Sequence, residues 1–221
     1  MQGHELLETF AGLTATPAVA AVMRHAARHP IANPAEPTLA EITAVGAQAA
    51  AEFGARLTGF DRVRLFHSPV KRCGQTAACI AQGAARAGLA VELAGAREEI
   101  GVDYILDVAE AGRLTVLHGD HFVRLWVAGK IPAAVVRPAR AVATRQADFV
   151  AARLREPTER GRRLDLHVSH DWNIIVLREI LLQVRHEEAG WLTFLDGVTF
   201  TADAGGVRAI YRRHIAGPLP S

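Results

Sequence analysis

Three short strand-like segments in this chain, one apolar throughout and two with apolar and polar residues mixed, each lead directly into a cluster of histidine, arginine or serine side chains. They are residues 18–22 before Arg24 and His25, residues 63–66 before His67 and Ser68, and residues 164–168 before Ser169, His170 and Asp171. Runs of this length indicate buried strands, and longer segments with helical periodicity separate them. This alternation predicts a three-layer α/β/α sandwich with a largely parallel central sheet. The carboxyl ends of parallel strands meet at one edge, so we expect the three clusters to converge there.

The helix and turn signals place the remaining elements. We expect helices from Thr38 toward Leu57 and over residues 70–87, 139–155 and 172–184. We expect strands over residues 191–194, 198–201 and 207–211, with the last two joined by a turn at 204–206 into an antiparallel ribbon. The sequence contains no repeat or linker, which favours one domain over residues 1–221 with a small cap or insertion around 97–135.

Within residues 97–135, one segment has two interpretations. Phe122, Leu125 and Trp126 have the spacing of the buried stripe of a surface helix. The neighbouring His118, Asp120 and His121 could instead face a substrate.

Charge and cysteine content narrow the class of partner. The 25 basic and 23 acidic side chains nearly cancel, which argues against nucleic acid. No leader-like N-terminus and no apolar stretch of about 20 residues is visible, so we expect no membrane partner.

Cys73 and Cys79 lie six apart on one predicted helix and would face different sides, which argues against a disulfide between them. Reduced thiols favour a cytoplasmic location, and the C-terminal ribbon could pair across a homodimer.

The arginines beside the strand ends suggest phosphate chemistry. A phosphoryl group is a compact dianion, and guanidinium groups match its oxygens with paired donors. Arg24, Arg28 and Arg72 lie in or next to the first two clusters and fit this role.

Three motifs carry a resemblance to a known family. Residues 24–30 read Arg-His-Ala-Ala-Arg-His-Pro, residues 68–76 read Ser-Pro-Val-Lys-Arg-Cys-Gly-Gln-Thr, and residues 170–174 read His-Asp-Trp-Asn-Ile. In this order they resemble the signatures of the histidine phosphatase superfamily, which includes phosphoglycerate mutase-like and acid-phosphatase-like enzymes. The segment with Thr43, Gly46 and Gln48 is similar to a further family motif. The resemblance spans roughly residues 18 to 180, and several motifs in order are far more specific than one.

The resemblance implies a reaction and a role for each residue. His25 would attack phosphorus and form a phosphohistidine, while Arg24, Arg28 and Arg72 bind the phosphoryl group. His170 would donate to the phosphoryl oxygens, and Asp171 would protonate the leaving oxygen. The enzyme would need no metal or other cofactor, and its partner would be a small phosphorylated substrate.

Some assignments remain open at this point. Glu98 or Glu99 could be the proton donor, as a loop glutamate is in the mutase-like branch, or both could be solvated loop residues. His67 could face the substrate. Ala26 replaces the usual glycine of the first motif, which implies a backbone that does not need a positive φ angle.

Structural roles compete with the functional ones. Arg28 could pair with Glu36, Arg72 could be a charge on a helix surface, and Ser68 could cap that helix. We expect Gln75 and Thr76 to pack or hydrogen bond within that helix, and Asn173 to brace the loop after Asp171. The histidine pairs 25/29, 118/121 and 167/170 have ligand-like spacing, but their loop and strand contexts disfavour a metal site.

The sequence therefore predicts a metal-independent phosphomonoesterase. The alternatives are a phosphomutase of the same fold and a protein that binds a phosphorylated ligand without turnover.

Overall fold

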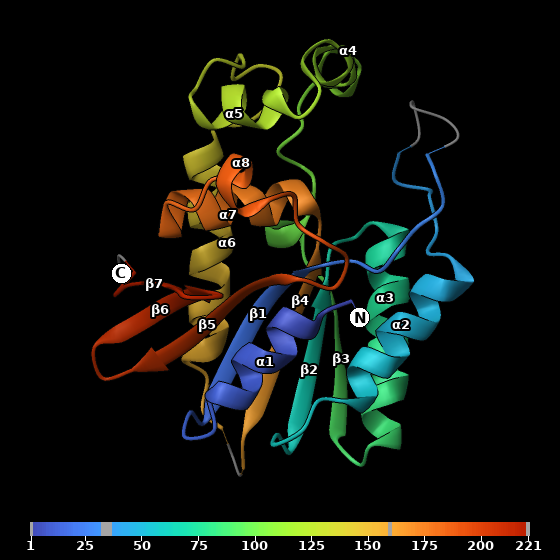
Figure 1. The fold of residues 1–221 in the computed structure, drawn as a ribbon, viewed down its shortest axis with the longest axis vertical. Coiled ribbons are helices and arrows are strands. Elements are labelled where there is room, and N and C mark those ends of the chain that lie inside the picture. The colour runs from blue at the N-terminus through green and yellow to red at the C-terminus, as the bar shows by residue number, and fades with distance from the viewer. Residues whose placement is uncertain (1, 32–36, 159–160, 220–221) are drawn as a thin grey trace.

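The computed structural model describes residues 2–31, 37–158 and 161–219, which fold into one mixed sheet between two layers of helices (Figure 1). The strands are β1 Ala18–Arg24, β2 Arg62–His67, β3 Ala90–Ala96, β4 Arg163–Ser169, β5 Gly197–Asp203, β6 Gly206–Tyr211 and β7 His214–Ala216. The helices are α1 His4–Gly12, α2 Ala44–Ala55, α3 Lys71–Arg86, the 3-10 turn η1 Glu98–Ile100, α4 Val108–His118, α5 His121–Val127, α6 Ala139–Leu154, α7 Asp171–Leu182 and α8 His186–Ala189. The expected α/β architecture is confirmed.

The strand order is β3-β2-β4-β1-β5-β6-β7, and the sheet has a parallel and an antiparallel half. Strands β3, β2, β4 and β1 are parallel, whereas β5, β6 and β7 form an antiparallel ribbon that joins β1 through β5. Arg24 at the end of β1 is in register with Ser169 at the end of β4. The residues that follow these two strands therefore emerge side by side.

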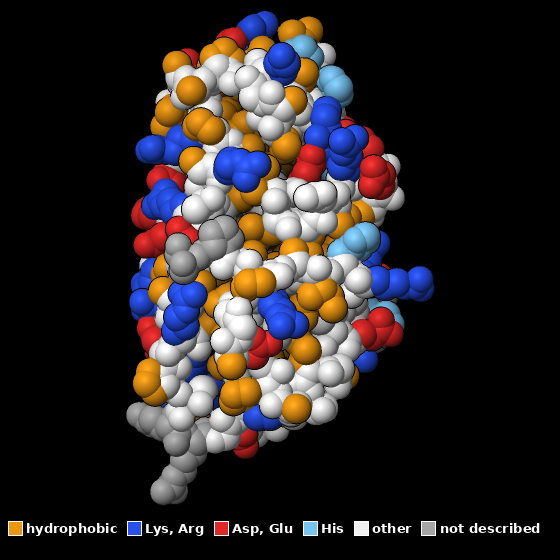
Figure 2. All heavy atoms as spheres, turned by 90° about the vertical axis from the view of Figure 1, so that its left-hand side faces the viewer, with side chains coloured by type: hydrophobic (Ala, Val, Ile, Leu, Met, Phe, Trp, Pro, Cys, Tyr) orange, Lys and Arg blue, Asp and Glu red, His pale blue; other side chains and the backbone are white. Residues whose placement is uncertain are grey.

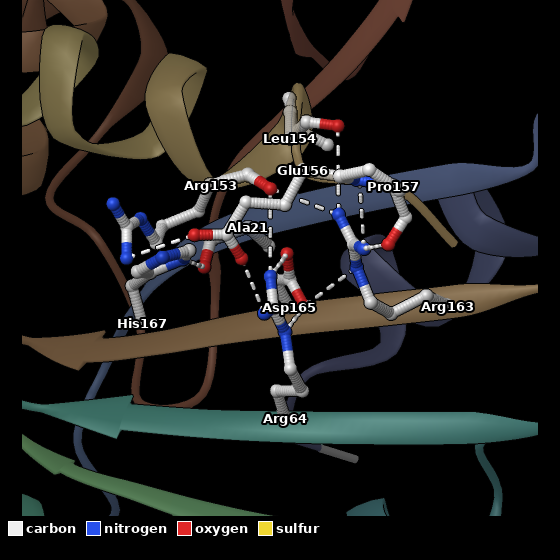
Figure 3. Close-up of polar contacts among 9 residues, drawn as sticks. All are labelled: Ala21, Arg64, Arg153, Leu154, Glu156, Pro157, Arg163, Asp165 and His167. Carbon is white, nitrogen blue, oxygen red and sulfur yellow. Dashed lines mark hydrogen bonds and ion pairs between the residues drawn. The ribbon is translucent and has the colours of Figure 1, made fainter. Parts of the chain in front are cut away.

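The two faces of the sheet are built differently. The face under α1, α2 and α3 is an apolar core that includes Val63, Leu65 and Leu164. The opposite face, under α6 and α7, combines a second apolar cluster with buried charges. Figure 3 shows the charged part, a network of ion pairs around Asp165 of β4 and Arg64 of β2 that we call the Asp165 network. Its members are Arg64, Arg153, Glu156, Arg163 and Asp165.

Most predicted elements are confirmed, and two are wrong. Helices α3, α6 and α7 and the β5–β6 hairpin lie where expected. Helix α2 begins at Ala44 rather than near Thr38, because the side chain of Thr43 accepts from the amide of Gly46 and caps the helix there. Residues 191–194 form a loop rather than a strand. The loop ends at Leu195, a buried residue with a φ of 62°.

Residues 97–135 form η1, α4 and α5 beyond the carboxyl end of the parallel strands (Figure 1). Phe122 and Trp126 are buried and Leu125 is half-buried, as the helical spacing predicts. Phe122 stacks on Trp172 of α7 with ring centroids 4.9 Å apart. Trp126 stacks on Tyr104 at 5.1 Å. The aromatic contacts hold α5 against the body of the protein.

The remaining surface is mixed in character. Figure 2 shows acidic and basic side chains interspersed on the face beside α6 and the C-terminal ribbon. Within the described ranges, none of the helices has the length and apolarity needed to cross a bilayer. Both cysteines lie on α3 as free thiols.

Candidate active site

His25 lies immediately after β1 and is buried. Its Nδ1 is 2.8 Å from the carbonyl oxygen of Ala26. A carbonyl only accepts, so Nδ1 carries the proton and Nε2 keeps its lone pair. That lone pair accepts from Nε of Arg72 at 3.0 Å. Ala26 is not among the residues with a positive φ, so the alanine fits this turn without strain, as expected.

Arg72 is the residue that joins the clusters after β1 and β4. It lies in the first turn of α3 and is 8% exposed, so its interpretation as a surface charge is wrong. Its Nε donates to His25, its Nη2 lies 3.2 Å from Nδ1 of His170, and its Nη1 donates to the carbonyl of Pro37 at 2.8 Å. No carboxylate contacts this guanidinium among the residues that the structure describes.

His170 follows β4 and is also buried. Arginine can only donate, so Nδ1 of His170 accepts from Arg72 and Nε2 carries the proton. Nε2 then donates to the hydroxyl of Ser68 at 2.9 Å. Ser68 was expected to cap α3, but the cap residue is Val70, whose amide lies 3.3 Å from the Ser68 hydroxyl. Ser68 thus fixes the imidazole of His170 as well as the start of the helix.

Arg24 and Asp171 form an ion pair next to His25, with 2.8 Å between Nη2 and Oδ2. The loop before β5 closes over this pair. Nε1 of Trp191 donates to the same Oδ2 at 3.1 Å, and Nη1 of Arg24 donates to the carbonyl of Leu192 at 2.5 Å. The ring of Phe194 lies 4.2 Å from the guanidinium carbon of Arg24. Nε of Arg24 is buried without a partner in the described structure, which leaves one donor for a ligand.

The first motif is braced by residues from α2 and α3. The amide and hydroxyl of Thr43 both donate to the carbonyl of Ala27, and the Thr76 hydroxyl accepts from the amide of Ala26 at 3.0 Å. Gly46 lies so close to Ala27 that a side chain there would strike its carbonyl. The Gln75 side chain accepts from the amide of Ile42 at 3.0 Å. The predicted hydrogen bond within the helix is confirmed for Thr76, whose hydroxyl donates to the carbonyl of Arg72 at 2.7 Å, whereas the bond of Gln75 leaves the helix for Ile42.

Arg28 is half-buried, and its Nη1 donates to the carbonyl of His29 at 2.8 Å. It lies near enough to lower the pKa of both Arg24 and Arg72. The alternative partner, Glu36, lies outside the described residues.

The electrostatics of the site favour neutral imidazoles and an added anion. Burial, with the charges of Arg72 and Arg24, lowers the pKa of His25 to about 3. Burial and the same cations also lower the pKa of His170 well below its usual value. Burial lowers the pKa of Arg24 and of Arg72 as well. A bound dianion would relieve each of these penalties.

The structure separates the two candidate glutamates. Exposed Glu98 lines a cavity with Val70 and Lys71, beside Arg72. Glu99 lines different cavities, against α6. Asp171 is therefore the acid in contact with the cluster, Glu98 is at its edge, and Glu99 faces away. His67 is half-buried over Gly74 and bonds to the carbonyl of Ser68.

Two polar residues after β4 attach η1 to the site. The Ser169 hydroxyl donates to the carbonyl of Ile100 at 2.7 Å, and Nδ2 of Asn173 donates to the carbonyl of Gly101 at 2.8 Å. Asn173 also accepts from the hydroxyl of Tyr104 at 3.0 Å. Asn173 was expected to brace the loop around Asp171, but it braces the residues after η1.

Sequence reasoning missed Trp191, Leu192 and Phe194 as parts of the site. They follow no recognisable motif, and their contacts with Arg24 and Asp171 depend on the position of β5 next to β1.

In the described ranges, one group of potential metal ligands comes together, formed by Glu179, His186 and Glu187. The guanidinium of Arg124 donates to both carboxylates. A cation therefore already occupies this cluster.

Comparisons with known proteins agree on one family. A sequence model of the histidine phosphatase superfamily, branch 1, matches residues 21–196. No curated protein matches the chain. YhfR from Bacillus stearothermophilus has a TM-score of 0.60 at 16% identity, covering 86% of this chain and 94% of that one.

Two further solved structures have named activities. A mycobacterial glucosyl-3-phosphoglycerate phosphatase has a TM-score of 0.56 at 15% identity, covering 83% of this chain and 89% of its own. A phosphoglycerate mutase from Bacillus anthracis has a TM-score of 0.53 at 15% identity, covering 92% of both chains. At sequence identities this low, the similarity shows a shared fold and does not show a shared activity.

Proposed function

Because the chain belongs to the histidine phosphatase superfamily, we propose that it hydrolyses phosphomonoesters through a phosphohistidine formed on His25. The observation that carries this proposal is the contact of Arg72 with two buried neutral imidazoles, those of His25 and His170. Arg72 has no carboxylate partner in the described structure, and it donates to the lone pair of His25 Nε2. If a phosphoryl dianion takes over this arginine, the lone pair is released for attack on phosphorus.

The proposed reaction has two steps. Nε2 of His25 attacks phosphorus, the bond to the leaving oxygen breaks, and an acid supplies that oxygen with a proton. The carboxylate left on the acid then takes a proton from water, which attacks the phosphohistidine, breaks its N–P bond and releases phosphate and neutral His25. Arg24, Arg28 and Arg72 bind the phosphoryl oxygens throughout, and His170 adds a donor as negative charge develops.

We assign the proton donation to Asp171, with Glu98 as the competing candidate. Asp171 lies against Arg24 at the nucleophile, but its Oδ2 already accepts from Arg24 and Trp191. Donation from Asp171 therefore requires that contact to rearrange. Glu98 has no such contact in the described structure and faces the cavity beside Arg72.

The first test is release of phosphate from p-nitrophenyl phosphate in the presence of EDTA. His25→Ala should abolish turnover, and mass spectrometry of rapidly quenched wild type should find a phosphoryl group on His25. His29→Ala is the matched control, since His29 lies in the same motif but is exposed. Undiminished turnover by His25→Ala would overturn the proposal, and a wild type that turns nothing over would favour the non-catalytic alternative.

A leaving-group series identifies the acid. Loss of the proton donor should slow an alkyl phosphate by about 10²–10⁴-fold and p-nitrophenyl phosphate much less. We expect this pattern for Asp171→Asn. If Glu98→Gln shows it instead, Glu98 is the donor. Glu99→Gln is the control because Glu99 faces α6.

A further inference from the structure

Next to Arg72 the structure has a cavity of about 680 Å³ that the phosphate-handling residues do not fill, which we call the Arg72 cavity. It is lined by Thr38, Leu39, Pro69, Val70, Lys71, Glu98, Val102 and Asp103. Its walls come from the segment before α2, from the start of α3 and from η1 with the residues that follow it.

Each wall is attached to the candidate active site. The first wall follows Pro37, whose carbonyl accepts from Nη1 of Arg72 at 2.8 Å. The second wall, Val70 and Lys71, directly precedes Arg72 in the chain. The third wall is held by the bonds of Ser169 to Ile100 and of Asn173 to Gly101. The cavity therefore lies between segments that hold Arg72 and the candidate active site, and we take it as the space for the leaving group of a phosphoester bound at Arg72.

The lining is largely apolar. Pro69, Val70, Val102 and Leu39 contribute hydrocarbon surface, and Leu39 is 58% exposed. An exposed leucine at the mouth of a cavity offers contact area to an apolar ligand.

The charges in the cavity are unfavourable to an anion. The one cation of the lining, Lys71, is in an ion pair with Glu41. Asp103 is paired with Arg145 at 2.6 Å. Glu98 has no hydrogen-bond or ion-pair partner in the part of the chain that the structure describes. The unpaired charge of this cavity is thus a carboxylate, in contrast to the arginine-rich phosphate site beside it.

We propose that the substrate's leaving group has an apolar body and no negative charge: a neutral or amine-bearing alcohol, not a carboxylated one such as a phosphoglycerate. The proposal rests on the proposed phosphatase function. A carboxylate in the Arg72 cavity would lose its hydration beside Glu98 and Asp103 without gaining an unpaired cation. An amine would instead gain a partner in Glu98.

Matched aryl phosphates test the proposal. Phenyl phosphate, 4-carboxyphenyl phosphate and 4-(aminomethyl)phenyl phosphate differ in charge on one ring. We expect kcat/KM for the carboxyl compound to be on the order of tenfold below that of phenyl phosphate, as for one charge contact near a protein surface. The amine should equal or exceed phenyl phosphate. Equal or better turnover of the carboxyl compound would overturn the proposal.

A positive charge added to the lining of the Arg72 cavity should change the order of kcat/KM among the three aryl phosphates. Leu39→Lys places a cation in the cavity at an exposed position that tolerates substitution. It should raise kcat/KM for the carboxyl compound and lower it for the amine. Val45→Lys is the matched control, because Val45 is 71% exposed and does not line the cavity. Identical effects of the two lysines would show that the cavity does not receive the leaving group.

Binding of non-hydrolysable analogues separates this proposal from the proposed function. The corresponding benzylphosphonates can be compared by calorimetry. If they bind in the expected order but no phosphate ester is turned over, the phosphatase proposal fails, and what stands is the preference of the cavity for an uncharged or amine-bearing group over a carboxylate. If esters are turned over without the expected order, only the leaving-group proposal fails. If no phosphonate binds and no ester is turned over, both fail.

Discussion

Two groups of buried charges lie along the same strand, and they are partnered in opposite ways. In the Asp165 network (Figure 3), Nε and Nη2 of Arg64 each donate to one oxygen of Asp165 at 2.7 Å. The second arginine, Arg163, donates to the backbone carbonyls of Arg153 and Glu156 at 2.8 and 3.0 Å. At the other end of β4, Arg72 contacts two neutral imidazoles and one carbonyl.

The difference between the two groups appears in the pKa values of Arg64 and Arg72. Hydrogen bonds to Asp165 raise the pKa of Arg64, whereas burial lowers the pKa of Arg72. Within the described residues, each arginine of the Asp165 network is paired with a carboxylate, whereas Arg72 contacts none. We infer that buried charge marks a functional site when its partners are missing, and marks structure when they are present.

The largest expected effect comes from removing the unpartnered arginine. Arg72→Met should lower kcat/KM for p-nitrophenyl phosphate by about 10³-fold, because a donor to the transferring phosphoryl group is lost. The free energy of unfolding should stay equal or rise, since a buried cation without a carboxylate is removed. Urea denaturation beside steady-state kinetics checks both. A clear loss of stability would mean that Arg72 has a structural role, and would contradict the proposed difference between Arg72 and the Asp165 network.

The converse substitution breaks the Asp165 network. Asp165→Asn leaves Arg64 and Arg163 without their buried carboxylate and should cost about 3–5 kcal/mol of unfolding free energy. The kcat/KM of the folded fraction should be unchanged. Asp165→Leu combined with Arg64→Met and Arg163→Met removes the carboxylate together with both arginines that it pairs with, and should recover most of the loss. A large fall in kcat/KM at full folding would show that the two charge groups are coupled.

Acid should weaken the protein through its buried histidines. The pKa of His25 is about 3 and that of His167 is about 4, both lowered mainly by burial, against about 6.5 in the unfolded chain. Between these values the unfolded state binds more protons. The unfolding free energy is therefore complete above about pH 6.5 and falls with decreasing pH, by about 1.4 kcal/mol per pH unit for each histidine.

Variants divide this slope between the two histidines. His25→Asn and His167→Asn should each reduce the slope of unfolding free energy between pH 6.5 and pH 4.5. Exposed His29→Asn serves as the control. Slopes identical to wild type in both variants would contradict the assignment to these groups.

The smallest expected effect concerns the orientation of His170. Ser68→Ala removes the acceptor of its Nε2 proton and should lower kcat/KM by about fivefold, the worth of one ordinary hydrogen bond. It should also shift the acid limb of the pH profile, which a purely structural role would not do. Ser68→Thr, which retains the hydroxyl, should restore both. If the pH profile of Ser68→Ala matches wild type, Ser68 only supports α3.

Local signals predicted the parallel half of the fold and the residues near its strand ends. The strand-like segments before His25 and His170 determined where those side chains emerge, and the parallel register of β1 and β4 brings them together. The start of α2 has a local signal as well, because Thr43 is a favoured capping residue. The pattern from Thr38 predicts an earlier start, and the cap determines the observed one.

The loop over Arg24 could not be predicted in the same way. Trp191, Leu192 and Phe194 have the apolar and aromatic composition of a strand, and no local residue forbids one. What determines their conformation is distant in sequence: Leu192 receives a hydrogen bond from Arg24, and Trp191 donates to Asp171. A single sequence likewise did not indicate that Glu98 and Glu99 would face opposite sides of η1.

The position of β1 in the sheet has a consequence for biosynthesis. Both of its neighbours are made late: Ala18 pairs with Arg163 of β4, and Met23 pairs with Gly197 of β5. A ribosome-bound chain that has released β1, α2 and α3 already holds His25 and Arg72, but the nucleophile strand has no partner. Pairings so distant in sequence are slow to form and expose apolar strands meanwhile. Catalytic competence should therefore arise abruptly once β4 and β5 have been synthesised, and β1 has neither of its partners until then.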